Sequence, residues 1–275
     1  MRNGRRRSRA IRERQKKYAC VNPKLRNELA LVLVLVLETP DEEEDENDAR
    51  NVSVIRILIW RIKVSLKLYF LRHGETIYSE TGAYCGDLDP ELTSEGHQMA
   101  RAFAEAHRSI AWTAVYVSPM KRTIATAKPL CDALGLRMEL RDGLKEIRYG
   151  KWEDKSVEFV KQHYWDDYIH WLAEPAWNAP TGGETSVEIA SRASLVIAEI
   201  QKGYATGNVL VVSHKATIRI ILCDLLGIDL GRYRDRIDML AGSVSIVKFD
   251  LHGPLLQVLG DRAYMGEKLR ARTGT

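Results

Sequence analysis

The chain has 275 residues, of which 45% are hydrophobic, and its formal net charge is +4 at pH 7. Much of the basic excess lies near the N-terminus, so the rest of the chain lacks a broad basic surface and nucleic acid is excluded as its principal substrate. The four cysteines form no Cys-x-x-Cys pair and no zinc-ligand spacing with histidine, which predicts a reduced, cytoplasmic protein.

Residues 1–63 differ from the rest of the chain. An arginine-rich block precedes an apolar run, residues 29–37, and an acidic run, residues 41–46, follows shortly after it. A secretion signal is disfavoured because no small-residue cleavage site follows, and the apolar run is too short to span a membrane. The hypothesis is that translation begins at Val64 and that residues 1–63 are an artefact of the gene model. The alternative is a real but disordered extension, because charge blocks of one sign seldom pack.

The remaining residues, 64–275, follow one continuous α/β pattern, which predicts a single domain. Its first element is a largely apolar run, residues 66–70, followed closely by Arg72 and His73. This order is typical of a buried strand that delivers charged groups to its C-terminal end, where open α/β sheets bind their ligands.

Two further elements come next in the chain. Thr93 is a suitable N-cap for a helix whose apolar positions recur at helical spacing as far as residue 106. The apolar run of residues 114–117 then predicts a second strand, and Arg122 follows it at the start of a helix. We therefore expect Arg122 to lie near the end of the first strand.

Residues 152–181 contain many aromatic side chains, which predicts one or two helices with a broad aromatic face. Two interpretations stay open for this segment. One is ordinary core packing, and the other is a small helical cap over the ligand site.

The last third of the domain repeats the strand pattern. Thr185 and Glu188 form a capping box, which predicts a helix running to Gly203. The β-branched run of residues 209–212 then leads into His214 and another helix. Residues 243–260 predict a terminal hairpin, and hence an antiparallel edge on a mainly parallel sheet.

If these strands are neighbours, four side chains converge on a small volume: Arg72, His73, Arg122 and His214. That volume is rich in N–H donors and contains no carboxylate among these four, so it suits a tetrahedral oxyanion such as phosphate. The helices that begin near Arg122 and His214 would add the positive ends of their dipoles.

Six motifs in this order resemble those of the histidine phosphatase superfamily, which includes the cofactor-dependent phosphoglycerate mutases. The matching motifs are Leu71-Arg72-His73-Gly74-Glu75-Thr76, Leu92-Thr93-Ser94-Glu95-Gly96, Ser118-Pro119 through Arg122 to Ala127, Glu146-Ile147-Arg148-Tyr149-Gly150, Gly182-Gly183-Glu184-Thr185 and Val212-Ser213-His214. The resemblance covers roughly residues 66–260. It implies a three-layer α/β/α fold, with a mainly parallel central sheet flanked by helices on both faces.

The resemblance also implies a role for each central residue. His73 would attack phosphorus as a neutral imidazole, and water would hydrolyse the phosphohistidine. Arg72, Arg122 and His214 would neutralise the charge on the transferred group, so neither a metal nor another cofactor is expected. Glu146 would protonate the leaving oxygen and then deprotonate the attacking water.

Five more residues are candidates for substrate binding: Thr76, Ser79, Cys85, Gly86 and Lys215. Cys85 and Gly86 follow the nucleophile loop, where the family lines its substrate entrance. Lys215 stands directly after His214, where many relatives have glycine, and it could contact a substrate carboxylate or a second phosphate.

Three functions remain open. The preferred one is a metal-independent phosphomonoester hydrolase of the histidine acid type, acting on a small phosphorylated metabolite. A phosphoglycerate mutase is the first alternative, although Ile77-Tyr78-Ser79 and Gly82-Ala83-Tyr84 depart from the mutase pattern and the loop after Trp152 is acidic and aromatic. A non-catalytic phosphate-binding protein is the second alternative, and the presence of all five central residues argues against it.

No membrane partner is expected. A homodimer is kept as one expectation because the family includes monomers, dimers and tetramers.

Overall fold

The computed structural model describes residues 65–272 and residue 274. The predictions for residues 1–63, and for a start at Val64, concern residues outside this range. The described part is an α/β domain built on one six-stranded sheet with the strand order β3-β2-β4-β1-β5-β6. Among the described residues, no helix is both long and apolar enough to cross a membrane.

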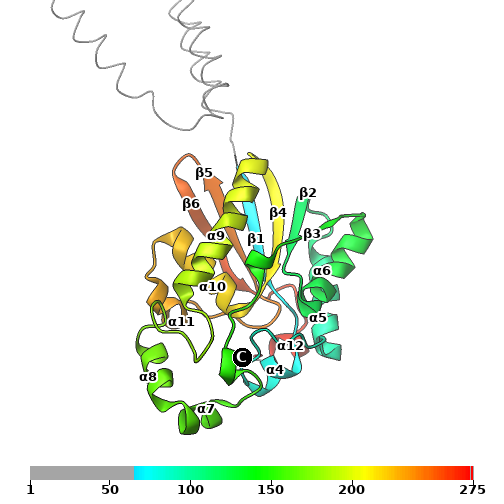
Figure 1. The fold of residues 1–275 in the computed structure, drawn as a ribbon. Helices are drawn as coiled ribbons and strands as arrows, with labels where there is room; N and C mark the ends of the chain where they lie inside the picture. Colours follow the sequence, from blue (N-terminus) through cyan, green and yellow to red (C-terminus); the bar gives the residue numbers. More distant parts are fainter. Residues whose placement is uncertain (1–64, 273, 275) are drawn as a thin grey trace, which may run out of the picture. The chain divides into compact units, whose positions relative to one another are not determined.

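The elements follow one another in the order expected of alternating strands and helices (Figure 1). The strands are β1 (Leu66–Arg72), β2 (Trp112–Val117), β3 (Met138–Leu140), β4 (Gly207–Ser213), β5 (Val244–Asp250) and β6 (Gly253–Asp261). The helices are α4 (Ile77–Thr81), α5 (Ser94–His107), α6 (Lys121–Leu134), α7 (Val157–His163), α8 (Trp165–Ala173), α9 (Ser186–Gly203), α10 (Lys215–Leu226), α11 (Tyr233–Arg236) and α12 (Glu267–Arg270). Short 3-10 turns cover Asp142–Leu144, Gly150–Trp152 and Leu230–Arg232.

Strands β1 to β4 are parallel, whereas β5 pairs antiparallel with β1 and β6 pairs antiparallel with β5. The mainly parallel sheet and its antiparallel hairpin edge are therefore confirmed. In the register of the central strands, Arg72 lies opposite Ser213, and Val117 lies opposite Val212. Three strands thus end at the same level, which brings the residues that follow them to one edge of the sheet.

Side chains of the central strands alternate between two cores, because successive residues of a strand point to opposite faces. Leu68 and Phe70 of β1 pack in the core that α9 and α10 cover. Tyr69 and Leu71 pack in the core that α5 and α6 cover. Burial on both faces explains why this strand reads as a largely apolar run rather than an alternating one.

The predicted helix starts are confirmed. The Thr93 side chain accepts a hydrogen bond from the Gly96 amide at the start of α5. At the start of α9, Thr185 and Glu188 form the reciprocal capping box. These caps satisfy amide groups that the first turn of a helix leaves without intrahelical partners.

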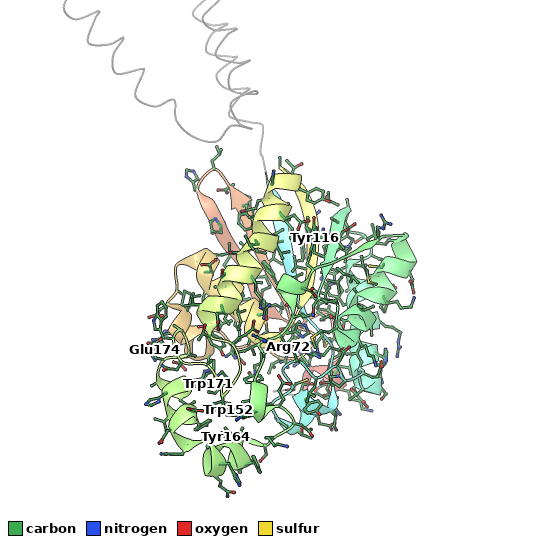
Figure 2. The ribbon with its side chains drawn as sticks, in the orientation of Figure 1. Arg72, Tyr116, Trp152, Tyr164, Trp171 and Glu174 are labelled. Atoms are coloured by element: carbon green, nitrogen blue, oxygen red, sulfur yellow. The ribbon has the colours of Figure 1, made fainter. Side chains whose placement is uncertain are left out.

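Residues 152–181 contain the two predicted helices, α7 and α8, and three of their aromatic side chains form a small core of their own. Trp152, Tyr168 and Trp171 are buried together with Val160. Trp152, Tyr164 and Trp171, which Figure 2 labels, lie in this part of the domain. Trp152 has ring-centroid distances of 5.4 Å to Trp171 and 5.6 Å to Tyr84.

Replacing Trp152 by alanine is expected to lower the free energy of unfolding by about 3 to 5 kcal/mol, because its fully buried indole leaves a large cavity when removed. Trp165, which is 56% exposed, is the matched control, and its replacement by alanine should cost less than about 1 kcal/mol. Guanidinium chloride titrations of the two variants measure the difference. Equal losses would show that the aromatic cluster does not stabilise the domain.

Candidate active site

A cavity of about 230 Å³ opens at the C-terminal ends of the central strands. All but one of the residues singled out in the sequence line it: Arg72, His73, Thr76, Ser79, Cys85, Gly86, Arg122, Glu146 and Lys215. His214 is the exception, because it is fully buried directly behind His73, with 5.2 Å between the two ring centroids. The strand ends thus bring together residues from β1, β4 and the start of α6, as predicted.

The tautomer of His73 is fixed by its own loop. Nδ1 lies 2.7 Å from the Gly74 carbonyl oxygen. A carbonyl can only accept, so Nδ1 carries the proton and Nε2 keeps its lone pair. Burial, together with the charges of Arg122 and Arg72, holds the pKa of His73 well below its usual value. The ring is therefore a neutral imidazole with one basic nitrogen.

His214 is held by two hydrogen bonds, one that its ring accepts and one that its ring donates. Its Nδ1 accepts a hydrogen bond of 3.2 Å from Nε of Arg122, so Nε2 carries the proton and donates to Oγ of Ser118 at 2.8 Å. Burial and the charge of Arg122 lower the pKa of His214 well below its usual value. A cationic His214 is thus disfavoured in this structure, because the Arg122 guanidinium already faces the nitrogen that would take up the proton. A phosphate dianion beside the ring would favour protonation again.

The two arginines are buried and fixed by backbone carbonyls. Arg122 donates from Nη1 to Leu88 O at 2.7 Å and from Nη2 to Gly86 O at 3.2 Å. Arg72 donates from Nη1 to Met239 O at 2.7 Å. Burial lowers the pKa of Arg72 to about 10, which still leaves the guanidinium charged at neutral pH. Both cations are therefore oriented before any anion binds, an arrangement that reduces the cost of reorganisation.

Glu146 is buried at the N-terminus of α10. Its Oε1 accepts hydrogen bonds from the amides of Ile147 and Thr217 and from Oγ1 of Thr217, and its Oε2 accepts from the amide of Ala216. The first amides of a helix have no intrahelical acceptors, which explains why an acceptor side chain is placed there. The contacts fix the carboxyl group at the wall of the cavity.

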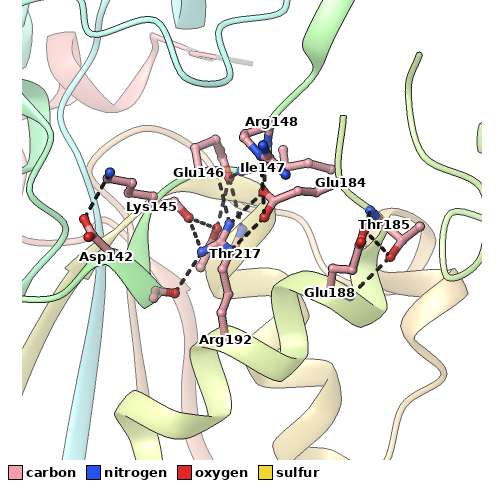
Figure 3. Close-up of polar contacts among 11 residues, drawn as sticks. Asp142, Lys145, Glu146, Ile147, Arg148, Glu184, Thr185, Glu188, Arg192 and Thr217 are labelled. Atoms are coloured by element: carbon pink, nitrogen blue, oxygen red, sulfur yellow. Dashed lines mark hydrogen bonds and ion pairs between the residues drawn. The ribbon is translucent and has the colours of Figure 1, made fainter. Parts of the chain in front are cut away.

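A second glutamate supports the loop that carries Glu146 (Figure 3). Glu184 accepts hydrogen bonds from the amide of Arg148 and from Nε and Nη2 of Arg192. Arg192 in turn donates to the carbonyls of Gly143, Lys145 and Glu146. The Gly-Gly-Glu-Thr motif thus acts through Arg192 to position residues 143–148.

The nucleophile loop packs against the start of α5 through two glycines. A Cβ on Gly74 would lie 2.5 Å from the Gly96 carbonyl oxygen, and a Cβ on Gly96 would lie 2.2 Å from the Glu75 carbonyl oxygen. Both contacts are with backbone, so neither glycine can be replaced without moving a chain segment. This close approach explains the glycines of the first two sequence motifs.

The C-terminal segment also supports this loop. Arg272 donates from Nε to Oε2 of the buried Glu75 at 2.7 Å. The Gly274 carbonyl oxygen accepts a hydrogen bond from Nη1 of Arg72 at 3.0 Å. Nothing in the sequence linked these residues to the site, because their contacts span about two hundred positions of the chain.

Two of the predicted substrate-binding residues stabilise the fold, and a third is an unreactive thiol. Thr76 and Ser79 form the capping box of α4, in which the Thr76 hydroxyl accepts from the Ser79 amide and the Ser79 hydroxyl accepts from the Thr76 amide. Burial raises the pKa of the Cys85 thiol to about 11, so it is not a reactive thiolate at neutral pH. Their contact with a substrate stays a prediction, although all three line the cavity.

The sequence reading missed several residues of the cavity wall, among them Tyr149, Arg219, Tyr233 and Arg234. Arg219 could have been found, because it follows Lys215 by four positions and so shares its helix face. Tyr233 and Arg234 belong to the short helix α11, and no motif marks that stretch.

Residues 152–181 are absent from the cavity wall, since Trp152 and Trp171 pack behind Tyr84 and Tyr149. A covering role for this segment stays a prediction.

Comparison with known proteins agrees with the geometry. Residues 68–262 match the family model of the histidine phosphatase superfamily, branch 1. Phosphoserine phosphatase 1 of Hydrogenobacter thermophilus is 33% identical over 168 residues, which cover 61% of this chain and 80% of the relative. The adenosylcobalamin/alpha-ribazole phosphatase of Escherichia coli is 26% identical over 199 residues, covering 72% and 97% of the two chains.

A solved structure of similar fold extends the comparison. The alpha-ribazole phosphatase from Shigella flexneri superimposes with a TM-score of 0.66 at 25% sequence identity, covering 73% of this chain and 99% of the other. The family model spans more than half of the chain and includes His73, Arg122, Glu146 and His214. The chain therefore belongs to the histidine phosphatase superfamily.

Proposed function

We propose that the protein is a metal-independent phosphomonoesterase that hydrolyses a small phosphorylated metabolite through a phosphohistidine on His73. One observation carries the proposal: a neutral imidazole with its proton fixed on Nδ1 lies in a cavity together with two buried guanidinium groups. Relatives named as phosphatases of phosphoserine and of alpha-ribazole compounds support a small phosphorylated substrate.

In the first step, Nε2 of His73 attacks phosphorus and the bond to the ester oxygen breaks. Arg72 and Arg122 stabilise the charge on the equatorial oxygens, and protonated Glu146 gives its proton to the leaving oxygen. In the second step, the Glu146 carboxylate takes a proton from water while the water oxygen attacks phosphorus. The P–N bond then breaks, which restores the neutral imidazole. His214, held between Arg122 and Ser118, would take a proton from solvent as the dianion binds and add its positive charge behind the phosphoryl group.

Turnover of p-nitrophenyl phosphate should persist within about twofold in excess EDTA, because the stabilising charges belong to the protein. Rapid quenching should trap a phosphoprotein that is labile in acid and stable in alkali, as expected for a phosphohistidine. Activity lost in EDTA and restored by Mg²⁺, or an acid-stable phosphoprotein, would contradict the proposal.

The mutase alternative uses the same phosphohistidine, so the two activities are distinguished by the products that they form. A parallel assay follows 3-phosphoglycerate for release of phosphate and for formation of 2-phosphoglycerate. We expect phosphate release to dominate. Interconversion of phosphoglycerates with negligible release of phosphate would assign the chain to phosphoryl transfer instead.

A further inference from the structure

One wall of the cavity is unusually basic. It consists of Lys215, Arg219, Tyr233 and Arg234, contributed by α10 and α11, and is called here the α10–α11 wall. Three of its members contact one another, because Arg219 donates from Nη2 to Arg234 O at 2.8 Å and its guanidinium lies 5.9 Å from the Tyr233 ring centroid. Arg122, by contrast, is fixed by the loop that contains Gly86 and Leu88.

The charge of the cavity exceeds what one phosphate group requires. Five cationic side chains line it, namely Arg72, Arg122, Lys215, Arg219 and Arg234, against the single carboxylate of Glu146. Asp89, which lies outside the cavity lining, is 3.8 Å from Nη1 of Arg122, so a bound phosphate dianion would leave about one positive charge uncompensated. Uncompensated charge in a partly buried site is costly, and a second anion would relieve that cost.

Lys215 bears part of this cost. It is the first residue of α10, where the positive end of the helix dipole opposes a cation. Burial, with the charges of Arg72 and Arg219, lowers the pKa of its ammonium group to about 8. Within residues 65–272, no carboxylate forms an ion pair with it. The ammonium group therefore keeps its donors for a ligand.

Two other polar groups of this wall also lack partners. The Tyr233 hydroxyl and Nε of Arg234 are buried, and neither has a hydrogen-bond partner in the described part of the chain. The rest of Arg234 is fixed, because Nη2 donates to Leu172 O at 3.1 Å and the guanidinium stacks 3.8 Å from the Trp171 ring centroid. Buried donors in this state fit a ligand that accepts hydrogen bonds.

We infer that the α10–α11 wall binds a second anionic group of the substrate, a carboxylate or a second phosphate, with Lys215 as its principal contact. The inference rests on the proposed phosphatase activity and specifies its substrate class. Lys215 and Arg234 thus select esters in which the scissile phosphate and another anion belong to one small molecule. Esters that carry only the scissile phosphate leave the buried donors unpaired and react more slowly.

Matched pairs of substrates test this inference on the full chain. The first pair is 3-phosphoglycerate and glycerol 3-phosphate, which differ by a carboxylate and a hydroxymethyl group. The second pair is 1,3-propanediol bisphosphate and 1,3-propanediol monophosphate. In at least one pair, kcat/KM should be about 10- to 100-fold higher for the member with the second anion. The pair with the larger ratio shows whether the wall prefers a carboxylate or a phosphate.

The variant Lys215→Met removes the charge and keeps the length of the side chain. It should lose about 10- to 100-fold in kcat/KM for the preferred ester with a second anion and less than about threefold for the counterpart that carries only the scissile phosphate. Inhibition by vanadate, which occupies only the phosphoryl position, should change less than threefold. Lys151→Met is the control, because Lys151 is exposed and lies outside the cavity wall.

Three outcomes overturn the inference: no preference in either pair, equal losses for both members of a pair, or a loss of vanadate inhibition in Lys215→Met. The last two would place Lys215 on the transferred phosphate itself. Failure of the proposed phosphatase activity would look different, because p-nitrophenyl phosphate and all four esters would then release no phosphate in the presence of the unmodified protein.

Discussion

Replacing His73 by asparagine is expected to lower kcat/KM for phosphate esters by at least about 10⁴-fold, because the nitrogen lone pair of an amide is delocalised into its carbonyl group and does not attack phosphorus. This loss corresponds to about 5.5 kcal/mol of transition-state stabilisation. The amide of asparagine can still donate to the Gly74 carbonyl oxygen, so the loop should keep its conformation. Steady-state hydrolysis of p-nitrophenyl phosphate measures the effect, and the acid-labile phosphoprotein should disappear with it.

The matched control is His97→Asn, which makes the same chemical change at an exposed position of α5. It should retain activity within about twofold. Denaturation midpoints of both variants show whether a loss of activity reflects chemistry or unfolding. Hydrolysis by His73→Asn within tenfold of the unmodified protein would exclude His73 as the nucleophile.

Glu146→Gln is expected to lower kcat/KM by about 10²- to 10⁴-fold for alkyl phosphates, whose leaving oxygen must be protonated as it departs. For p-nitrophenyl phosphate, whose leaving group is a stable anion, the loss should be about tenfold or less. The parameter kcat/KM reports only steps up to the first irreversible one, so it isolates the acid role from the later attack by water. The comparison of the two substrate classes is thus the decisive measurement.

Glutamine is the suitable replacement because it keeps one oxygen for the three donors that contact Oε1. Alanine would leave buried amides of α10 without acceptors and so destabilise the fold. A loss of activity could then reflect unfolding rather than the loss of the acid. Glu184→Gln is the control, because Glu184 positions the loop of Glu146 but does not line the cavity. It should weaken both substrate classes to the same extent. A uniform loss in Glu146→Gln as well would mean that Glu146 only positions its neighbours.

Local signals in the sequence determined the scaffold of this protein and the centre of its site. These signals act over a few residues, so they can be recognised from the sequence alone. They are the apolar run before Arg72, the cap at Thr93 and the capping box at Thr185. The edges of the strands then placed Arg72, His73 and Arg122 together, because parallel strands end at one side of a sheet. The order of the motifs completed the set with Glu146.

The tertiary structure decided what surrounds that centre. The placement of α11 against α10 brings Tyr233 and Arg234 into the cavity wall beside Lys215. No local sequence pattern predicts that these two helices meet. The link between Glu75 and Arg272 likewise depends on the path of the chain end. The sequence of the aromatic segment is equally consistent with a cap and with ordinary core packing. Its packing behind Tyr84 is a tertiary contact, which only the folded structure shows. Such contacts join residues far apart in the chain, and they are set by the packing of whole elements rather than by the preference of any short segment.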